Sequence, residues 1–204
     1  MTPDQVYSKI LTFIGCNTTC ICDLHSACSP LQNKIYKCSQ KLKTNVINFD
    51  DVKTEADRLI GNKARKSVDA VVNSTSNSFF CFVEIKSWDL CIKYNGSETG
   101  IKDQAKKYES DLPKKLNDSI EICQQITNDN SIFDNCKIVY ILVTDISVES
   151  GISSIYSDLT ALAGTSSDLT VLCNQLSLNI MKNISGVETR YWECRDFDKK
   201  LSSL

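Results

Sequence analysis

The chain has 204 residues, of which 42% are hydrophobic and 24% charged, and this composition excludes a disordered chain, a collagen and a coiled-coil rod. Its formal charge is −2, so nucleic acid would have to be contacted through local basic patches. The longest apolar stretch, Phe79–Ile85, is interrupted by Glu84 and is strand-sized, and the N-terminus lacks the basic start of a signal peptide. We therefore expect a cytoplasmic protein without membrane contacts.

The first part of the chain predicts a helical, cysteine-rich extension over residues 1–49, followed by a main domain over 50–204. Residues 16–30 are polar and have the composition of a loop. Apolar spacing and end signals predict helices over 3–14 (ending at Gly15), over about 31–42, and from Asp50 or Asp51 to Ile60 (ending at Gly61).

The rest of the chain alternates strand and helix patterns. Val68–Val72 and Phe79–Lys86 are predicted strands joined by a polar turn at 73–78. The later predicted elements are a helix over Ile101–Ile126 that Pro113 ends or kinks, a buried strand over Lys137–Thr144, a helix over 150–163, and short strands at Leu169–Leu172 and Val187–Cys194. This order predicts an α/β fold with one main sheet.

The two middle strands bring acidic and basic residues together. Alternation places Glu84 and Lys86 on one face at the end of the second strand. A hairpin centred near residues 76 and 77 puts Asp69 opposite Glu84. Two carboxylates so close repel each other unless a proton or a cation lies between them, and oxygen ligands of this kind suit Mg²⁺. Lys86 would then lie beside that cation.

This arrangement resembles the PD-(D/E)xK nuclease superfamily, the restriction-endonuclease-like enzymes. The residues that carry the resemblance are Asp69, a spacer of fourteen residues, and then Glu84-Ile85-Lys86. The resemblance implies an αβββαβ core, with a central mixed sheet flanked by helices, and Mg²⁺-dependent hydrolysis of phosphodiester bonds, with Mn²⁺ as a substitute. Asp69 and Glu84 would be metal ligands with help from the Ile85 carbonyl, and Lys86 would serve the attacking water.

Two further matches point to the RecB-like branch of this superfamily. Gln104 and Tyr108 form its Gln-x-x-x-Tyr motif on the helix after the catalytic strand. Glu55 stands where many members carry another site carboxylate on the preceding helix. Val68 replaces the proline of the family's name. The resemblance thus adds Glu55, Gln104 and Tyr108 to the expected catalytic residues, and nucleic acid, DNA in the first place, as the substrate.

The cysteines suggest an alternative of another class. The chain has eleven, without a signal peptide, so most are expected to be reduced thiols. Five cysteines (Cys16, Cys20, Cys22, Cys28 and Cys38) and His25 gather near the N-terminus, where they offer soft ligands for zinc without the usual paired spacing. The alternative is a non-catalytic module that uses this surface to hold a partner protein. Homodimerisation and recruitment by a partner subunit both stay open.

Overall fold

The computed structural model describes residues 1–25, 42–61, 64–74, 76, 78–148 and 165–204. Its centre is a six-stranded mixed sheet with the strand order β1-β2-β3-β4-β5-β6. The strands are β1 (Thr19–Cys20), β2 (Asn45–Asn48), β3 (Ala70–Asn73), β4 (Phe79–Lys86), β5 (Lys137–Thr144) and β6 (Glu188–Glu193). Neighbours from β1 to β4 pair antiparallel, whereas β4, β5 and β6 run parallel. The predicted α/β class is therefore correct.

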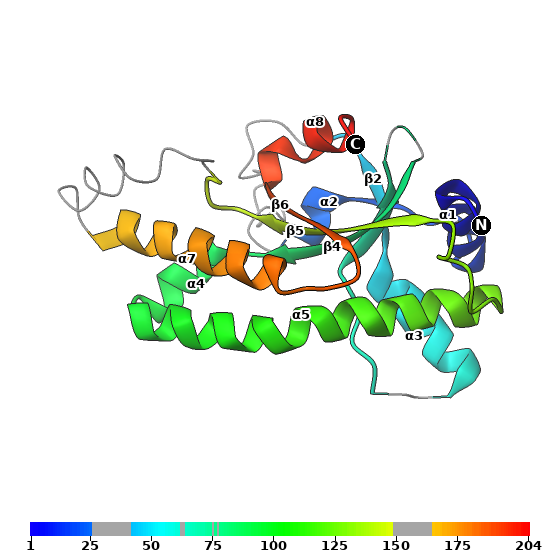
Figure 1. Cartoon of the computed structure of the whole chain (residues 1–204), viewed down its shortest axis with the longest axis horizontal. Coiled ribbons are helices and arrows are strands. Elements are labelled where there is room, and N and C mark those ends of the chain that lie inside the picture. Colours follow the sequence, from blue (N-terminus) through cyan, green and yellow to red (C-terminus); the bar gives the residue numbers. More distant parts are fainter. Residues whose placement is uncertain (26–41, 62–63, 75, 77, 149–164) are drawn as a thin grey trace.

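Helices cover both faces of this sheet (Figure 1). They are α1 (Pro3–Phe13), α2 (Ile21–Leu24), α3 (Phe49–Ile60), α4 (Trp88–Asn95), α5 (Glu98–Thr127), α7 (Thr165–Lys182) and α8 (Phe197–Leu201), with the short 3-10 helix η1 (Cys194–Asp196) before α8. One apolar core joins Phe80 and Phe82 of β4 to residues of α1, α3, α4, α5 and α7. A second core joins Cys81 and Val83 to residues of α2 and α8. Burial on both faces explains why β4 is apolar at almost every position.

The N-terminal segment is built into this layered unit. Val6 and Ile10 of α1 are fully buried in the first core. β1 and β2, which also belong to the predicted extension 1–49, extend the sheet beyond β3. The apolar face of α1 therefore packs against the same sheet as the main domain.

Several predicted elements agree with the structure. β4 and β5 have the predicted bounds, and β6 and α1 agree within one or two residues. α3 ends at Gly61 as predicted, but its N-cap is Asn48, whose side chain accepts a hydrogen bond from the Asp50 amide. The predicted helix over 150–163, and the one over 31–42 except its last residue, fall outside the described residues.

Other predictions were wrong. Leu169–Leu172 is part of α7, because apolar residues continue at helical spacing through Leu176 and Ile180. The segment 16–30 contains the short elements β1 and α2 in its described part. Pro113 does not end its helix, because α5 spans thirty residues in all, from Glu98 to Thr127. The other alternative, that Pro113 kinks the helix, stays a prediction.

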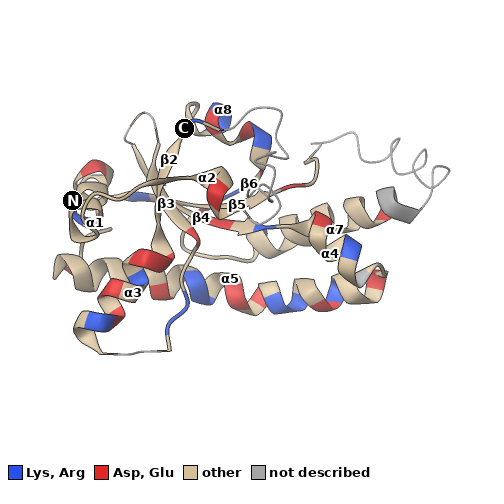
Figure 2. Ribbon diagram, turned by 180° about the vertical axis from the view of Figure 1, so that it is seen from behind, with Lys and Arg blue, Asp and Glu red and all other residues tan. Residues whose placement is uncertain are grey.

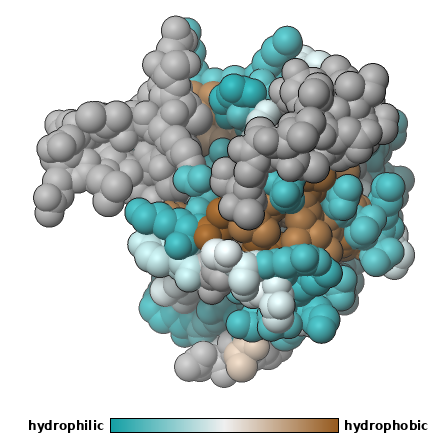
Figure 3. Space-filling view, turned by 90° about the vertical axis from the view of Figure 1, so that its left-hand side faces the viewer, coloured by the Kyte–Doolittle hydropathy of each residue, from teal (hydrophilic) through white to brown (hydrophobic). Residues whose placement is uncertain are grey.

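Seen from the end at which α5 and α7 begin, apolar residues gather in the middle and hydrophilic residues surround them (Figure 3). No helix within the described ranges combines the length and the apolarity needed to cross a bilayer. The cytoplasmic location stays a prediction.

Candidate active site

The β3–β4 hairpin has the register expected from its turn. Ala70 pairs with Val83, so one further step in the same register faces Asp69 toward Glu84. Asp69 lies just before β3, where its amide donates to the Val83 carbonyl at 3.1 Å. The Asp69 carboxylate is held in turn by the Ile85 amide, which donates to Oδ2 at 2.6 Å. Asp69 is thus fixed against the end of β4 that carries Glu84 and Lys86.

Glu84 is a completely buried acid. It shares the inner face of β4 with Phe80 and Phe82, and its exposed fraction is 0%. The Oε1 atom forms ion pairs with the ammonium groups of Lys86 and Lys115, the latter at 2.7 Å. The Oε2 atom is also buried and has no hydrogen-bond partner among the described residues. A buried carboxylate oxygen without a partner is unusual in a folded protein and suggests a missing ligand.

Lys115 is the site residue that the sequence analysis missed. It reaches the site from the middle of α5, and its Nζ atom lies 3.6 Å from Asp69 Oδ1 as well as 2.7 Å from Glu84 Oε1. The missed signal is a stripe at helical spacing, in which Gln104 and Tyr108 are followed by Asp111 and then Lys115. Acidic and basic residues alternate along this helix (Figure 2).

The charges of the site change the acidity of its members. Burial raises the pKa of Glu84, and the nearby Asp69 carboxylate raises it further, although Lys86 and Lys115 oppose the change. Burial by itself would lower the pKa of Lys86, but the Glu84 and Asp69 carboxylates outweigh it, so this pKa lies above its ordinary value. Lys86 is therefore a charged ammonium at neutral pH.

Tyr108 and Gln104 flank this cluster on α5. The Lys86 ammonium lies 5.2 Å from the centre of the Tyr108 ring, within cation–π range. The same ring also packs edge to face against Trp88, at 5.3 Å between centroids. Burial raises the pKa of Tyr108 to about 12, although a hydrogen bond with Gln104 opposes the rise. Tyr108 thus lies next to the acid–lysine cluster, and Gln104 contacts Tyr108.

Glu55 lies elsewhere. It is half exposed on α3 and accepts two hydrogen bonds from the Arg58 guanidinium, at 2.6 and 2.9 Å. This pairing lowers the pKa of Glu55. In the described part of the chain, no group of three or more His, Cys, Asp or Glu side chains is arranged to hold a metal ion. Asp69 and Glu84 are the two acids that Lys115 contacts, and Asp111 adds a third negative charge near Lys86.

The basic groups near the site are largely engaged within the protein. Arg65 is buried and paired with Asp57 of α3, and Lys66 forms an ion pair with Asp111 at 2.6 Å. On α5, the acidic partner of Lys102 is Glu98. Free positive charge for a nucleic-acid groove is therefore less than the sequence suggests. Lys34, Lys37, Lys41 and Lys63, which the sequence also offers as basic residues, lie outside the described part.

Two of the N-terminal cysteines, Cys20 and Cys22, belong to the apolar core on the other face of the sheet. Cys20 and Cys22 are buried with α2 in the second core, and His25 is buried next to them in sequence. Cys16 is exposed. Cys28 and Cys38 lie outside the described residues, so the predicted zinc cluster is described only in part.

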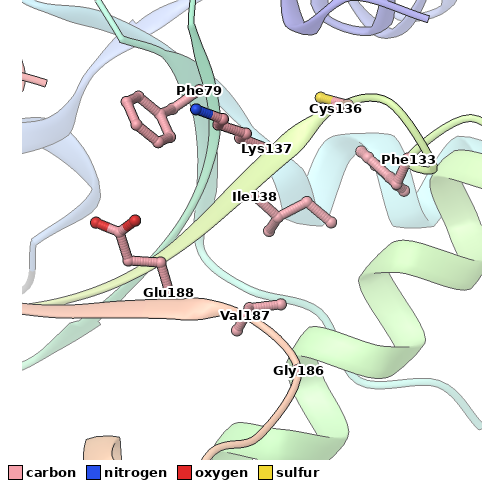
Figure 4. A pocket seen from close by; sticks show the side chains of 8 residues that line it. All are labelled: Phe79, Phe133, Cys136, Lys137, Ile138, Gly186, Val187 and Glu188. Carbon is pink, nitrogen blue, oxygen red and sulfur yellow. The ribbon is translucent and has the colours of Figure 1, made fainter.

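A cavity of about 390 Å³ lies at the opposite, amino-terminal ends of β4, β5 and β6. Figure 4 shows Phe79, Lys137 and Glu188 among its lining residues. The Lys137 ammonium lies 5.6 Å from the centre of the Phe79 ring. Because Glu84 and Lys86 lie at the carboxyl end of β4, this cavity is separate from the acid–lysine cluster.

Comparison with protein-family models, with curated proteins and with solved structures finds no match to this chain.

Proposed function

We propose that this chain is a metal-dependent nuclease that hydrolyses phosphodiester bonds of nucleic acid, DNA in the first place. The observation that carries the proposal is the convergence of Asp69 and Glu84 from neighbouring strands, with Lys86 paired to Glu84. A fully buried acid beside a second, partly exposed acid, both flanked by ammonium groups, is a costly arrangement that a purely structural role does not require. Its position at the end of β4 matches what the resemblance to the PD-(D/E)xK superfamily implies.

The order of elements supports the same proposal. If β1, α2, α3 and α4 are all treated as additions, the remaining elements run α1, β2, β3, β4, α5 and β5, which is the αβββαβ order expected of a restriction-endonuclease-like core. α3 lies between β2 and β3 as an addition to this order. The three antiparallel strands followed by a parallel fourth form the mixed sheet that such a core requires.

The donor atoms fit a hard divalent cation such as Mg²⁺ or Mn²⁺. Asp69 Oδ1 and the unpartnered Glu84 Oε2 are carboxylate oxygens, the ligands that Mg²⁺ prefers. The Ile85 carbonyl would complete the protein ligands. When bound, the metal supplies a Lewis acid that stabilises negative charge on the phosphate and activates water.

The remaining residues have roles that follow from their contacts. Lys86 holds the attacking water and counters charge that develops on the phosphate. Tyr108 limits the positions open to Lys86, because its ring lies under the ammonium and is itself packed on Trp88. Gln104 hydrogen-bonds Tyr108 and lies where it can contact the nucleic acid.

A cleavage assay tests the proposal. The full chain is incubated with plasmid DNA, single-stranded DNA or RNA in the presence of Mg²⁺ or Mn²⁺, beside Glu84→Gln and Lys86→Ala. Lys93→Ala is the matched control, because Lys93 also lies over a tyrosine ring, that of Tyr94, but on the exposed face of α4. We expect cleavage by the parent and the control, and loss in both site variants. Equal inactivity of all four proteins would favour the non-catalytic alternative.

A further inference from the structure

The ammonium group of Lys115 lies between the two carboxylates that the proposed function assigns to the metal. It is 2.7 Å from Glu84 Oε1 and 3.6 Å from Asp69 Oδ1. Its side chain is 20% exposed, whereas Glu84 is fully buried. A monovalent cation of the protein itself thus neutralises the acid pair from the side of α5.

The charges around Lys115 are balanced. Three acids (Asp69, Glu84 and Asp111) face three ammonium groups (Lys66, Lys86 and Lys115). Adding a divalent cation to this neutral set places it beside two ammonium groups at once, which is unfavourable in a partly buried site. Lys86 is held by Glu84 and by the Tyr108 ring. Lys115 is therefore the group that can leave.

The Lys115 ammonium also has an alternative acidic partner, Asp111, if it leaves Asp69 and Glu84. Asp111 lies one turn earlier on α5, on the same helical face, where the hydrogen bond from Lys66 lowers its pKa and the charge of Lys115 lowers it further. The four-carbon stem of lysine is flexible enough to swing along the helix without moving the backbone. The phosphate groups of a substrate would offer the displaced ammonium a second partner.

We propose that Lys115 is a built-in competitor of the divalent metal, so that the metal binds only as this ammonium leaves the Asp69–Glu84 pair. The inference rests on the proposed function, because it takes these two acids as the metal ligands. It adds a residue outside the Asp69, Glu84 and Lys86 triad, and it gives that residue an effect on metal affinity that is separate from catalysis.

Metal binding without nucleic acid tests this inference. Mn²⁺ is titrated into the full chain and the free ion is measured by electron paramagnetic resonance, for the parent, Lys115→Met and Lys115→Arg. Lys114→Met is the matched control, since Lys114 is the residue before Lys115 on α5 but pairs with Asp118 at 2.8 Å. We expect Lys115→Met to bind Mn²⁺ at least tenfold more tightly than the parent. Lys115→Arg and Lys114→Met should bind like the parent.

The outcomes separate the two proposals. If the parent binds Mn²⁺ and Lys115→Met binds it equally or less tightly, the competitor role is wrong while the metal site stands. If neither binds Mn²⁺ at any accessible concentration, both proposals fail. If Lys115→Met does not fold, the inference is tested on the parent protein instead. Its lysines are acetylated with and without Mn²⁺, and mass spectrometry measures how much each lysine has reacted. Saturating Mn²⁺ must then raise the reactivity of Lys115 relative to Lys114, and an unchanged ratio would overturn the inference.

Discussion

The backbone amide of Ile85 donates a 2.6 Å hydrogen bond to Asp69 Oδ2, so one acid of the site is positioned by the strand that carries the other. Because of this bond, Asp69 has a structural role as a hydrogen-bond acceptor as well as its proposed role as a charged metal ligand, and two substitutions can separate the two. In Asp69→Asn the amide oxygen still accepts from Ile85, whereas Asp69→Ala leaves that N–H without its partner. We expect Asp69→Ala to lower the free energy of unfolding by about 1–2 kcal/mol and Asp69→Asn by less.

Urea unfolding measures this difference in stability. Mn²⁺ binding measures the chemical role of Asp69 as a metal ligand. Both Asp69 variants should lose metal affinity, because both lack the charge, although only the alanine variant loses stability. A stable Asp69→Ala would show that the Ile85 contact contributes little. An Asp69→Asn protein with parental Mn²⁺ affinity would remove Asp69 from the ligands.

Metal should also stabilise the fold through Glu84. Ligand at about a hundred times its dissociation constant adds about 2.7 kcal/mol to the free energy of unfolding. For a domain of this size, each kcal/mol corresponds to about 2–4 °C in melting temperature. We therefore expect saturating Mg²⁺ or Mn²⁺ to raise the parent's melting temperature by about 5–10 °C, an effect that chelation by EDTA reverses.

Two variants locate this stabilisation. Glu84→Gln removes a buried charge with an unpartnered oxygen, so its melting temperature should not respond to metal. Glu55→Gln is the control, because Glu55 is half exposed and paired with Arg58 outside the cluster. It should respond like the parent. A Glu55→Gln protein that loses the response would place Glu55 in the metal site after all.

Tyr108 is expected to act through its ring. Phenylalanine keeps the ring under the Lys86 ammonium and against Trp88, whereas leucine removes both contacts. A partly buried cation–π contact contributes about 0.5–2 kcal/mol. If this energy fixes Lys86, Tyr108→Leu should cleave about tenfold more slowly while Tyr108→Phe stays near the parental rate. Initial rates under saturating Mg²⁺ measure the effect, and equal losses in both variants would point to the hydroxyl group.

The sequence was enough for the hairpin and its acids because their determinants are local. Strict alternation fixes which face of β4 carries Glu84 and Lys86, and the turn fixes the register that faces Asp69 toward Glu84. These features need no knowledge of the remaining fold. The Gln104–Tyr108 spacing is local in the same way, because one helical turn places both side chains on one face.

Lys115 and Glu55 show that local sequence patterns do not predict contacts that depend on how the helices pack. Lys115 reaches Glu84 from thirty-one residues away, and only the packing of α5 across the sheet brings them together. Glu55 satisfied a family pattern, but the buried face of α3 is set by Val52 and Ala56, which leaves Glu55 beside Arg58. Leu169–Leu172 failed for a related reason, because a short apolar run fits a strand and a buried helix equally well.

Pro113 offers a final prediction, which concerns stability alone. It lies inside α5, where it lacks the amide hydrogen that would otherwise bond to the Glu109 carbonyl, yet the helix continues on both sides. The helix persists because Leu112 and Leu116 next to it are buried in the first core. Alanine restores the bond, and Pro is about 3 kcal/mol less favourable than Ala inside a helix. The added freedom of the unfolded chain reduces this gain by about 1 kcal/mol.

We therefore expect Pro113→Ala to raise the free energy of unfolding by about 2 kcal/mol, measured by urea unfolding without metal. Ser110→Ala, on the exposed surface of the same helix, serves as the control and should change stability by only about 0.5 kcal/mol. A loss of stability in Pro113→Ala would mean that the proline ring fills space that alanine cannot.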